Sequence, residues 1–437
     1  MKDNTRKISL IFVNISNFFR SELSGGILVL IAAIIGIIWA NSPWRETYFS
    51  LLKVELGFKI GDFEFSKTLL HWINDGLMTF FFLLVGMEIK REMLVGELSS
   101  FKKSIFPVIA ATGGVILPIV IYSLFNYRLD SFRGWGIPMA TDIAFTIAVM
   151  MLLSKKISHA SRVNITALAI ADDIAALIVI AIFYSTGVKF EYVVISLVIV
   201  LVLLLLNKLG MRFTLLYVTF GFILWLLLLN SGIHATIAGV LLAFTIPADV
   251  TDNAFKNLKR LSQSINVIIK STQEGKVLGS TKSDFQETKK LLKNIEPHLQ
   301  RFETAISNWV SFLILPLFAL ANAGVYIGNF SIKDLTHPVV LGVSLGLLLG
   351  KSTGIFTFSY LSVKLKIADI SNKVSWKEYY GVSWLAGIGF TMALFIAHLS
   401  FDSTPHYLDL AKVGIYLGSI FSVLVGTLIL IFTKRTK

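Results

Sequence analysis

The chain has 437 residues, of which 55% are hydrophobic and 15% are charged, and its formal net charge is +13. This composition and a mean hydropathy of +0.73 exclude a water-soluble globular protein and predict an all-α polytopic membrane protein. The absence of cysteine excludes disulfides, thiolate metal sites and thiol nucleophiles, so oxygen atoms and seven histidines remain for chemistry.

The first twenty residues are charged at intervals and amphipathic, with neither a long apolar core nor a small-residue cleavage site. This pattern predicts an interfacial helix rather than a cleavable signal peptide. Apolar runs of about 17 to 25 residues, the length that crosses a bilayer, follow it. We predict twelve transmembrane helices, at 24–40, 68–87, 104–126, 136–153, 163–185, 190–207, 213–230, 233–249, 305–326, 337–361, 378–400 and 409–433.

An even number of spans places both termini on one side of the membrane and assigns successive loops to alternate sides. That side carries 30 of the 40 Lys and Arg residues, the opposite side carries nine, and Lys351 is left over in the middle of span 10. Positive charge marks the cytoplasmic face, so both termini are predicted to be cytoplasmic. The net charge is then explained by orientation in the membrane and requires no nucleic-acid partner.

Residues 41–67 connect the first two spans and are predicted to form an external loop. The stretch VELGFKIGDFEFSK alternates apolar and polar residues around Gly61 and Asp62, which predicts a β-hairpin at 54–67. An isolated hairpin is only marginally stable in water. We therefore expect it to pair with the edge of a second copy and form a homodimer, with a plain surface hairpin as the alternative.

Span 4 contains RGWGIPMATDIAF, in which two glycines and Pro138 precede Thr141 and Asp142. Proline lacks the helical N–H and obstructs the carbonyl four residues earlier, so we expect the span to be broken or to begin near Thr141. Span 11, GVSWLAGIGFTMALF, has a matching interruption at Gly387 and Gly389. Paired interrupted segments in two halves point to a transporter site built from inverted repeats, with two broken helices that cross.

Span 5, ALAIADDIAALIVIAIFY, carries Asp172 and Asp173 with apolar neighbours on both sides. A charge near the bilayer centre costs at least about 2.5–3.5 kcal/mol on insertion scales, so two adjacent acids predict a functional site. Neighbouring helix positions differ by about 100° in direction, so the two carboxylates can line neighbouring walls of one cavity. Crowded in a partly desolvated cavity, they hold protons or a cation.

A hard monovalent cation such as Na⁺ takes oxygen ligands, which Asp172, Asp173, the Thr141 hydroxyl and freed backbone carbonyls would supply. Because the cation and protons compete for the same oxygens, a carrier built in this way exchanges one for the other. The broken helices expose dipole ends that need charges nearby, and Asp142 and Lys351 have the right signs. We assign these two residues to charge compensation and the Asp172/Asp173 pair to transport.

Between spans 8 and 9, residues 250–304 are rich in Lys, Ser, Asn and Gln. Apolar residues recur there at helical spacing, in two runs that begin at Phe255 and Leu292. The pattern predicts a cytoplasmic helical insertion with a loop near Gly275 to Thr281. A solvated connector is the alternative interpretation.

Seven motifs resemble, in the same order and over nearly the whole chain, those of the NhaA-type Na⁺/H⁺ antiporter family. They are FFLLVGMEIKREM, IPMATDIAFTIAVM, ALAIADDIAALIVIAIFY, NSGIHATIAGV, LILPLFALANAGV, GLLLGKSTGI and AGIGFTMALFIA. The resemblance implies one transporter domain over 1–437, in the bacterial inner membrane, with inverted-topology repeats and no cofactor. It also implies electrogenic exchange of cytoplasmic Na⁺ or Li⁺ for external H⁺ by alternating access, which serves sodium and pH homeostasis.

Carried over residue by residue, the resemblance implies that Asp172 and Asp173 bind the cation and the protons, with Thr141 at the broken span beside them. Asp142 and Lys351 compensate the dipoles of the two broken spans. Lys351 is implied to pair with Asp172 when the cation is absent.

The family's cytoplasmic pH-sensing region maps to Glu88, Arg91 and Glu92 at the end of span 2 and to Glu303 before span 9. The sequence departs from the family here in two ways. Thr304 stands where better-known members have histidine, and the long insertion directly precedes Glu303.

Intramembrane acidic and polar residues also occur in other classes of membrane protein. An intramembrane aspartyl protease uses two buried aspartates, but neither ATD nor ADD provides its Gly-x-Gly-Asp element. A sodium-coupled solute symporter would need an additional pocket for an organic substrate, and a channel would need a continuous polar pore. Asn74, Asp75 and His234 are the other polar residues in spans, and we expect them to join helices or to pack between them.

Overall fold

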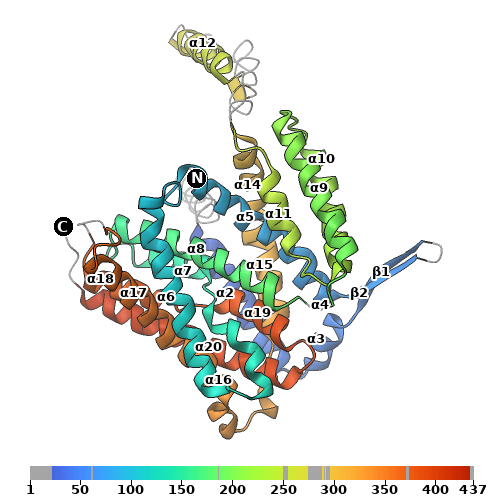
Figure 1. The fold of residues 1–437 in the computed structure, drawn as a ribbon, viewed down its shortest axis with the longest axis vertical. Coiled ribbons are helices and arrows are strands. Elements are labelled where there is room, and N and C mark those ends of the chain that lie inside the picture. The colour runs from blue at the N-terminus through green and yellow to red at the C-terminus, as the bar shows by residue number, and fades with distance from the viewer. Residues whose placement is uncertain are drawn as a thin grey trace, which may run out of the picture.

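The computed structural model describes residues 22–60, 63–185, 187–249, 254–273, 288–289, 291, 296–370 and 374–433, and most of these residues are helical (Figure 1). The predicted interfacial helix at 1–20 and the predicted loop near 275–281 lie outside these residues.

The membrane helices fall into two groups that pack mainly within themselves (Figure 1). We call the first the core bundle, and it contains α6 (Phe101–Asn126), η2 (Asp130–Met139), α7 (Ile143–Leu152), α8 (His159–Phe183), α16 (Pro338–Leu345), η6 (Gly346–Lys351), α17 (Ser352–Lys364), α18 (Trp376–Leu385), α19 (Phe390–Phe401) and α20 (Pro405–Phe432). We call the second the flanking bundle, and it contains α2 (Glu22–Ala40), α3 (Arg45–Leu52), α4 (Leu69–His71), η1 (Trp72–Leu77), α5 (Met78–Val95), α9 (Phe190–Lys208), α10 (Thr214–Ser231), α11 (Ile237–Thr245), α14 (His298–Trp309), η3 (Val310–Ile314) and α15 (Leu315–Asn322). The two bundles meet where α2 packs on α7 and α5 packs on α8.

Nine helices of the described residues are long and apolar enough to cross a membrane, and two bent helix pairs bring the number of spans to eleven. The remaining predicted span, 233–249, contains only the nine-residue helix α11 after a turn in which Gly232 has a φ of 81°. At 1.5 Å per residue α11 is about 14 Å long, roughly half the thickness of a bilayer core. This part of the chain is therefore not a full-length helix.

Both interruptions predicted from glycine and proline are present as bends. The axes of η2 and α7 differ by 41°, and those of α18 and α19 differ by 46°. η2 is a 3₁₀ segment of ten residues that contains Pro138, and a break of three residues separates it from α7. Helix geometry thus changes at Pro138, where proline removes a hydrogen-bond donor, whereas the bend between α18 and α19 lies at Gly387 and Gly389.

The predicted hairpin is also present, and it projects from the flanking bundle (Figure 1). Strands β1 (Glu55–Ile60) and β2 (Phe63–Thr68) pair antiparallel, with Glu55 opposite Thr68 and Ile60 opposite Phe63. The indole nitrogen of Trp72 donates to the Leu56 carbonyl at 2.9 Å and ties the hairpin to η1. Dimer formation through the hairpin stays a prediction.

Inside the predicted insertion, α12 (Ala254–Gln273) is a helix that stands apart from both bundles (Figure 1). The second apolar run, where it is described, belongs to α14, which buries Leu299 and Phe302. The short 3₁₀ segments η4 (Ile327–Asn329) and η5 (Ile332–Thr336) connect α15 to α16. We call the end of the molecule with α12 the α12 side and the opposite end the hairpin side.

One charge that the sequence assigns to a loop lies inside a helix. The sequence counts Lys412 with the external loops, but the structure buries it in α20 with 6% of its surface exposed. Its partners are described below, because they connect the two bundles.

Candidate functional site

The candidate site lies where the two interrupted spans cross. The Asp142 N–H, just before α7, donates to the carbonyl of Ile388, between α18 and α19, at 2.7 Å. The Asp142 carboxylate accepts from the N–H of Phe145 at 3.0 Å and from the N–H and hydroxyl of Thr391 at 2.9 and 2.5 Å. One carboxylate therefore caps the N-termini of both α7 and α19, which are the positive ends of their dipoles.

Lys351 supplies the opposite charge. It is the last residue of the π-helical segment η6, and its side chain is fully buried. The ammonium donates to Asp172 Oδ2 at 2.6 Å and to the carbonyl of Met139, the last residue of η2. Because the C-terminal end of a helix is negative, the ammonium compensates that end while it pairs with a buried carboxylate.

The two carboxylate oxygens of Asp172 have different surroundings. Oδ2 accepts from Lys351 and, at 2.7 Å, from the Thr141 hydroxyl. Oδ1 is buried and has no hydrogen-bond partner. The Thr141 hydroxyl also lies 3.2 Å from the carbonyl of Ala386, so it has a second acceptor. A buried carboxylate oxygen without a partner is rare, and it has the chemistry of a ligand for a hard cation.

Asp173 faces a different environment from its neighbour. Its side chain lines a cavity of about 240 Å³ between the bundles, which Asp172 does not line. Asp142 and Thr391 also border this cavity, and Glu88 and Arg91 border it as well. The two adjacent acids therefore face different directions, as their helix positions predict. Asp172 faces Lys351, and Asp173 faces the cavity.

Comparisons with known proteins agree with this geometry. Residues 16–430 match the family described as Na⁺/H⁺ antiporter 1. The chain is 42% identical over 415 residues to the Na⁺/H⁺ antiporter NhaA of Koribacter versatilis (strain Ellin345), which covers 94% of this chain and 90% of that protein. It is 44% identical over 431 residues to NhaA of Helicobacter pylori (strain G27), with 97% and 96% covered, and 43% identical over 413 residues to NhaA 1 of Clostridium beijerinckii, with 94% and 93% covered. The chain belongs to the Na⁺/H⁺ antiporter 1 family.

The resemblance found in the sequence is thereby confirmed, and the family's predicted pH-sensing residues can be located. Arg91 and Glu303 form an ion pair of 2.7 Å between α5 and α14, and Glu92 lies 4.0 Å from Arg91. Thr304 is exposed, and its hydroxyl donates to the carbonyl of Gln300 in its own helix. Of the predicted pH-sensing residues, Glu88 and Arg91 line the 240 Å³ cavity and so share it with Asp173.

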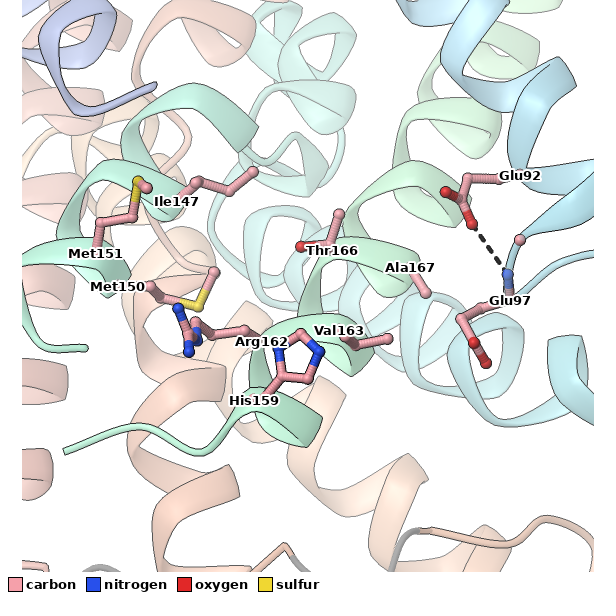
Figure 2. A pocket seen from close by; sticks show the side chains of 11 residues that line it. Glu92, Glu97, Ile147, Met150, Met151, His159, Arg162, Val163, Thr166 and Ala167 are labelled. Atoms are coloured by element: carbon pink, nitrogen blue, oxygen red, sulfur yellow. Dashed lines mark hydrogen bonds between the residues drawn. The ribbon is translucent and has the colours of Figure 1, made fainter. Parts of the chain in front are cut away.

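A second cavity has a volume of about 420 Å³, and Figure 2 shows the residues that line it. Figure 2 shows Glu92 and Glu97 on one side of it, where the Glu97 N–H donates to Glu92 at 3.0 Å, and Arg162 of α8 across from them. Ile147 and Thr166 line both cavities. The antiporter therefore has two adjoining cavities between α5 and the helices α7 and α8.

Polar residues of spans 2 and 8 form a separate cluster. Asp75 lies 2.9 Å from the His71 ring and 3.4 Å from the His234 ring. Asn74 exchanges hydrogen bonds with Asn322 of α15 at 2.8 and 3.2 Å. These residues join helices of the flanking bundle, which agrees with the expectation from the sequence.

Thr391 was not predicted to belong to the site. A threonine two residues after the interruption at Gly389 is typical of a helix start, and this signal could have identified it. Within the described part of the chain, no group of three or more His, Asp or Glu side chains is arranged to hold a resident metal ion.

Proposed function

We propose that the chain is an electrogenic secondary antiporter, and not an enzyme, which exchanges cytoplasmic Na⁺ or Li⁺ for external H⁺ at Asp172 and Asp173. The observation that carries the proposal is the buried Lys351–Asp172 ion pair beside Asp173, with one Asp172 oxygen left without a partner. The relatives described above are named Na⁺/H⁺ antiporters, which supports the same pair of ions.

The cation reaches Asp173 through the cavity that Glu88 and Arg91 border. There it takes oxygen ligands from Asp173, from Asp172 Oδ1 and from the Thr141 hydroxyl. A cation on Asp172 competes with the Lys351 ammonium for the same carboxylate. The ion pair is therefore intact when the cation is absent and weakened when it binds.

Proton balance makes the exchange electrogenic. In the cation-free site Asp173 holds one proton and Lys351 holds another, while Asp172 is ionised. Binding of one Na⁺ displaces the proton of Asp173. The cation on Asp172 also displaces the Lys351 ammonium, which then loses its proton because a buried ammonium without a counter-charge is strongly disfavoured. Two protons then move inward for each Na⁺ that moves outward. Asp142 stays ionised throughout, as the shared cap of α7 and α19.

The α12 side is proposed to be cytoplasmic, with both termini there, in a bacterial inner membrane. The ion pair between Arg91 and Glu303, together with Glu88 and Glu92, is proposed to adjust access to the cavity with pH. The hairpin at 54–67 is proposed to join two copies as a homodimer through its exposed edge.

The test uses inside-out vesicles that are energised and loaded with a pH-sensitive dye. Addition of NaCl or LiCl is expected to dequench the dye with the wild-type chain, and Asp172→Asn and Asp173→Asn are each expected to abolish the response. Asp402→Asn removes an exposed acid at the end of α19 and should leave it unchanged. A Na⁺ response that survives in either site variant, or no response between about pH 6 and 9, where shifted carboxyl groups titrate, contradicts the proposal.

A further inference from the structure

Among the described residues, the cavity at Asp173 lies toward the α12 side. The cavity at Asp173 is bordered by Glu88 and Arg91 in the second half of α5 and by Ser307 of α14, all toward the α12 side. Toward the hairpin side, large aromatic side chains pack between the bundles. The Phe395 ring of α19 lies 5.2 Å from that of Phe82 and 6.3 Å from that of Phe318. Transporters built from two bundles open each side in turn by rocking one bundle against the other.

The hairpin-side end of α15 is where polar groups connect the bundles. α15 belongs to the flanking bundle and ends at Asn322, so its last carbonyls lack partners within the helix. Two donors come from α20 of the core bundle. The Tyr416 hydroxyl donates to the carbonyl of Ala323 at 2.6 Å, and the Lys412 ammonium donates to that of Gly324 at 3.1 Å.

A third donor comes from the flanking bundle itself. The Tyr48 hydroxyl of α3 lies 2.8 Å from the carbonyl of Leu320 and 2.9 Å from that of Ala321. Tyr48 and Tyr416 therefore present the same chemical group to neighbouring carbonyls of one helix end. They differ in the bundle that carries them.

We propose that Tyr416 and Lys412 are positioning residues that form a hairpin-side latch between α20 and α15, and that this latch must open before the site can face the hairpin side. The inference rests on the proposed antiport and on the alternating access that the family resemblance implies. Both bonds join groups on different bundles, so a rocking motion breaks them, whereas the Tyr48 bond moves with α15.

Burial explains why the latch has a measurable strength. Lys412 is almost completely buried, and the carboxylate of Asp409, one turn earlier in α20, is 3.9 Å away. An ammonium near a helix C-terminus is also favoured by the helix dipole. When the bundles separate on this side, water replaces the carbonyl partners. Each latch bond therefore stabilises the closed state only by the difference in free energy between a hydrogen bond to the carbonyl and one to water. Removal of one such hydroxyl should therefore raise the population open to the hairpin side about two- to tenfold.

The chain contains no cysteine, so a single introduced cysteine can report the opening. His398 of α19 is a suitable position, because it is buried, lies within electrostatic range of both Lys412 and Asp75, and has a ring Nε2 without a hydrogen-bond partner. The probe is a membrane-impermeant maleimide added to proteoliposomes of the His398→Cys chain. The measured quantity is the labelling rate with and without NaCl.

In this background, Tyr416→Phe is expected to raise the labelling rate about two- to tenfold, and Lys412→Met is expected to raise it as well. Tyr48→Phe is the matched control, and its rate should equal that of the parent. The proposal is overturned if Tyr416→Phe and Tyr48→Phe give equal labelling rates, whether or not these exceed the rate of the parent. It is also overturned if the cysteine is labelled in none of the variants. Thermal unfolding of both Tyr→Phe variants checks that each has folded.

The outcome can be separated from that of the proposed function. If the latch is absent but exchange at the aspartates is correct, labelling does not distinguish the two tyrosines while Asp173→Asn still abolishes Na⁺-driven dequenching. If the exchange reaction is wrong, Asp173→Asn retains dequenching, whatever the labelling shows.

Discussion

Asp142→Asn tests whether one charge holds the crossing of the two interrupted helices together. The substitution keeps the size of the side chain but removes the negative charge that α7 and α19 share. Asparagine retains one acceptor oxygen and presents an NH₂ group in place of the other. That group meets the donors of Thr391 or Phe145 and cannot accept from them. With its NH₂ group toward Phe145, the asparagine loses one of the three hydrogen bonds outright, and the two bonds from Thr391 lose their charge assistance.

A hydrogen bond contributes about 1.5–3 kcal/mol when one group is charged and about 0.5–1.5 kcal/mol when both are neutral, so one lost bond and two weakened bonds lower the free energy of unfolding by about 3–6 kcal/mol. Unfolding entropy near 2.1 cal/mol/K per residue converts 1 kcal/mol into about 1 °C for a chain of 437 residues. The expected fall in unfolding midpoint is therefore roughly 3–7 °C.

The measurement is thermal unfolding in detergent, followed by the intrinsic fluorescence of the eight tryptophans. Asp402→Asn makes the same chemical change at an exposed position and should shift the midpoint by less than about 1 °C. An Asp142→Asn midpoint within about 1 °C of wild type would refute the assignment of Asp142 to charge compensation.

Three further predictions concern the site, the packing and the assembly. Thr141→Val should raise the Na⁺ concentration for half-maximal dequenching about tenfold, because it removes a proposed cation ligand. The control is Thr146→Val, which removes a buried hydroxyl bonded to the carbonyl of Leu385 and should change this concentration by less than about twofold. Gly354→Ala should greatly reduce the yield of monodisperse protein on size exclusion, because the added Cβ would overlap the Gly113 carbonyl. At Gly76→Ala the added Cβ would meet only a ring atom of Trp72 at 3.4 Å, so this variant should be tolerated. Replacement of the hairpin by a short Gly-Ser linker should shift the chain from dimer to monomer in light scattering, and an unchanged mass would exclude the hairpin as the dimer contact.

Much of the fold was predictable because the lipid environment restricts the options. Long apolar runs must form helices, and Pro138 and the paired glycines of span 11 mark interruptions that the structure shows as bends of 41° and 46°. The hairpin followed from alternation around Gly61. The cost of a charge in the membrane also singled out Asp142, Asp172 and Lys351, which the structure brings together at the crossing.

Other features depend on tertiary contacts that a sequence pattern does not contain. The span at 233–249 is mostly apolar, yet it begins with a turn, and only nine of its residues form the helix α11, which packs along α5. Lys412 has the sequence context of a residue near a membrane surface, but partners on another bundle bury it. The short 3₁₀ and π segments that place Met139 and Lys351 have no sequence signature of their own.

The unequal surroundings of the two site aspartates predict unequal effects on stability. Asp172 pairs with Lys351 inside the core bundle, so Asp172→Asn leaves a fully buried ammonium without its counter-charge, a change that costs about 3–5 kcal/mol.

Asp173 instead borders the cavity between the bundles, and Asp173→Asn removes a charge that pairs with no cation of the described residues at salt-bridge distance. Both variants should lose exchange, but we expect only Asp172→Asn to unfold about 3–5 °C below wild type. Equal midpoints for the two variants would mean that Lys351 is not held by Asp172, and the competition between cation and ammonium would lose its structural basis.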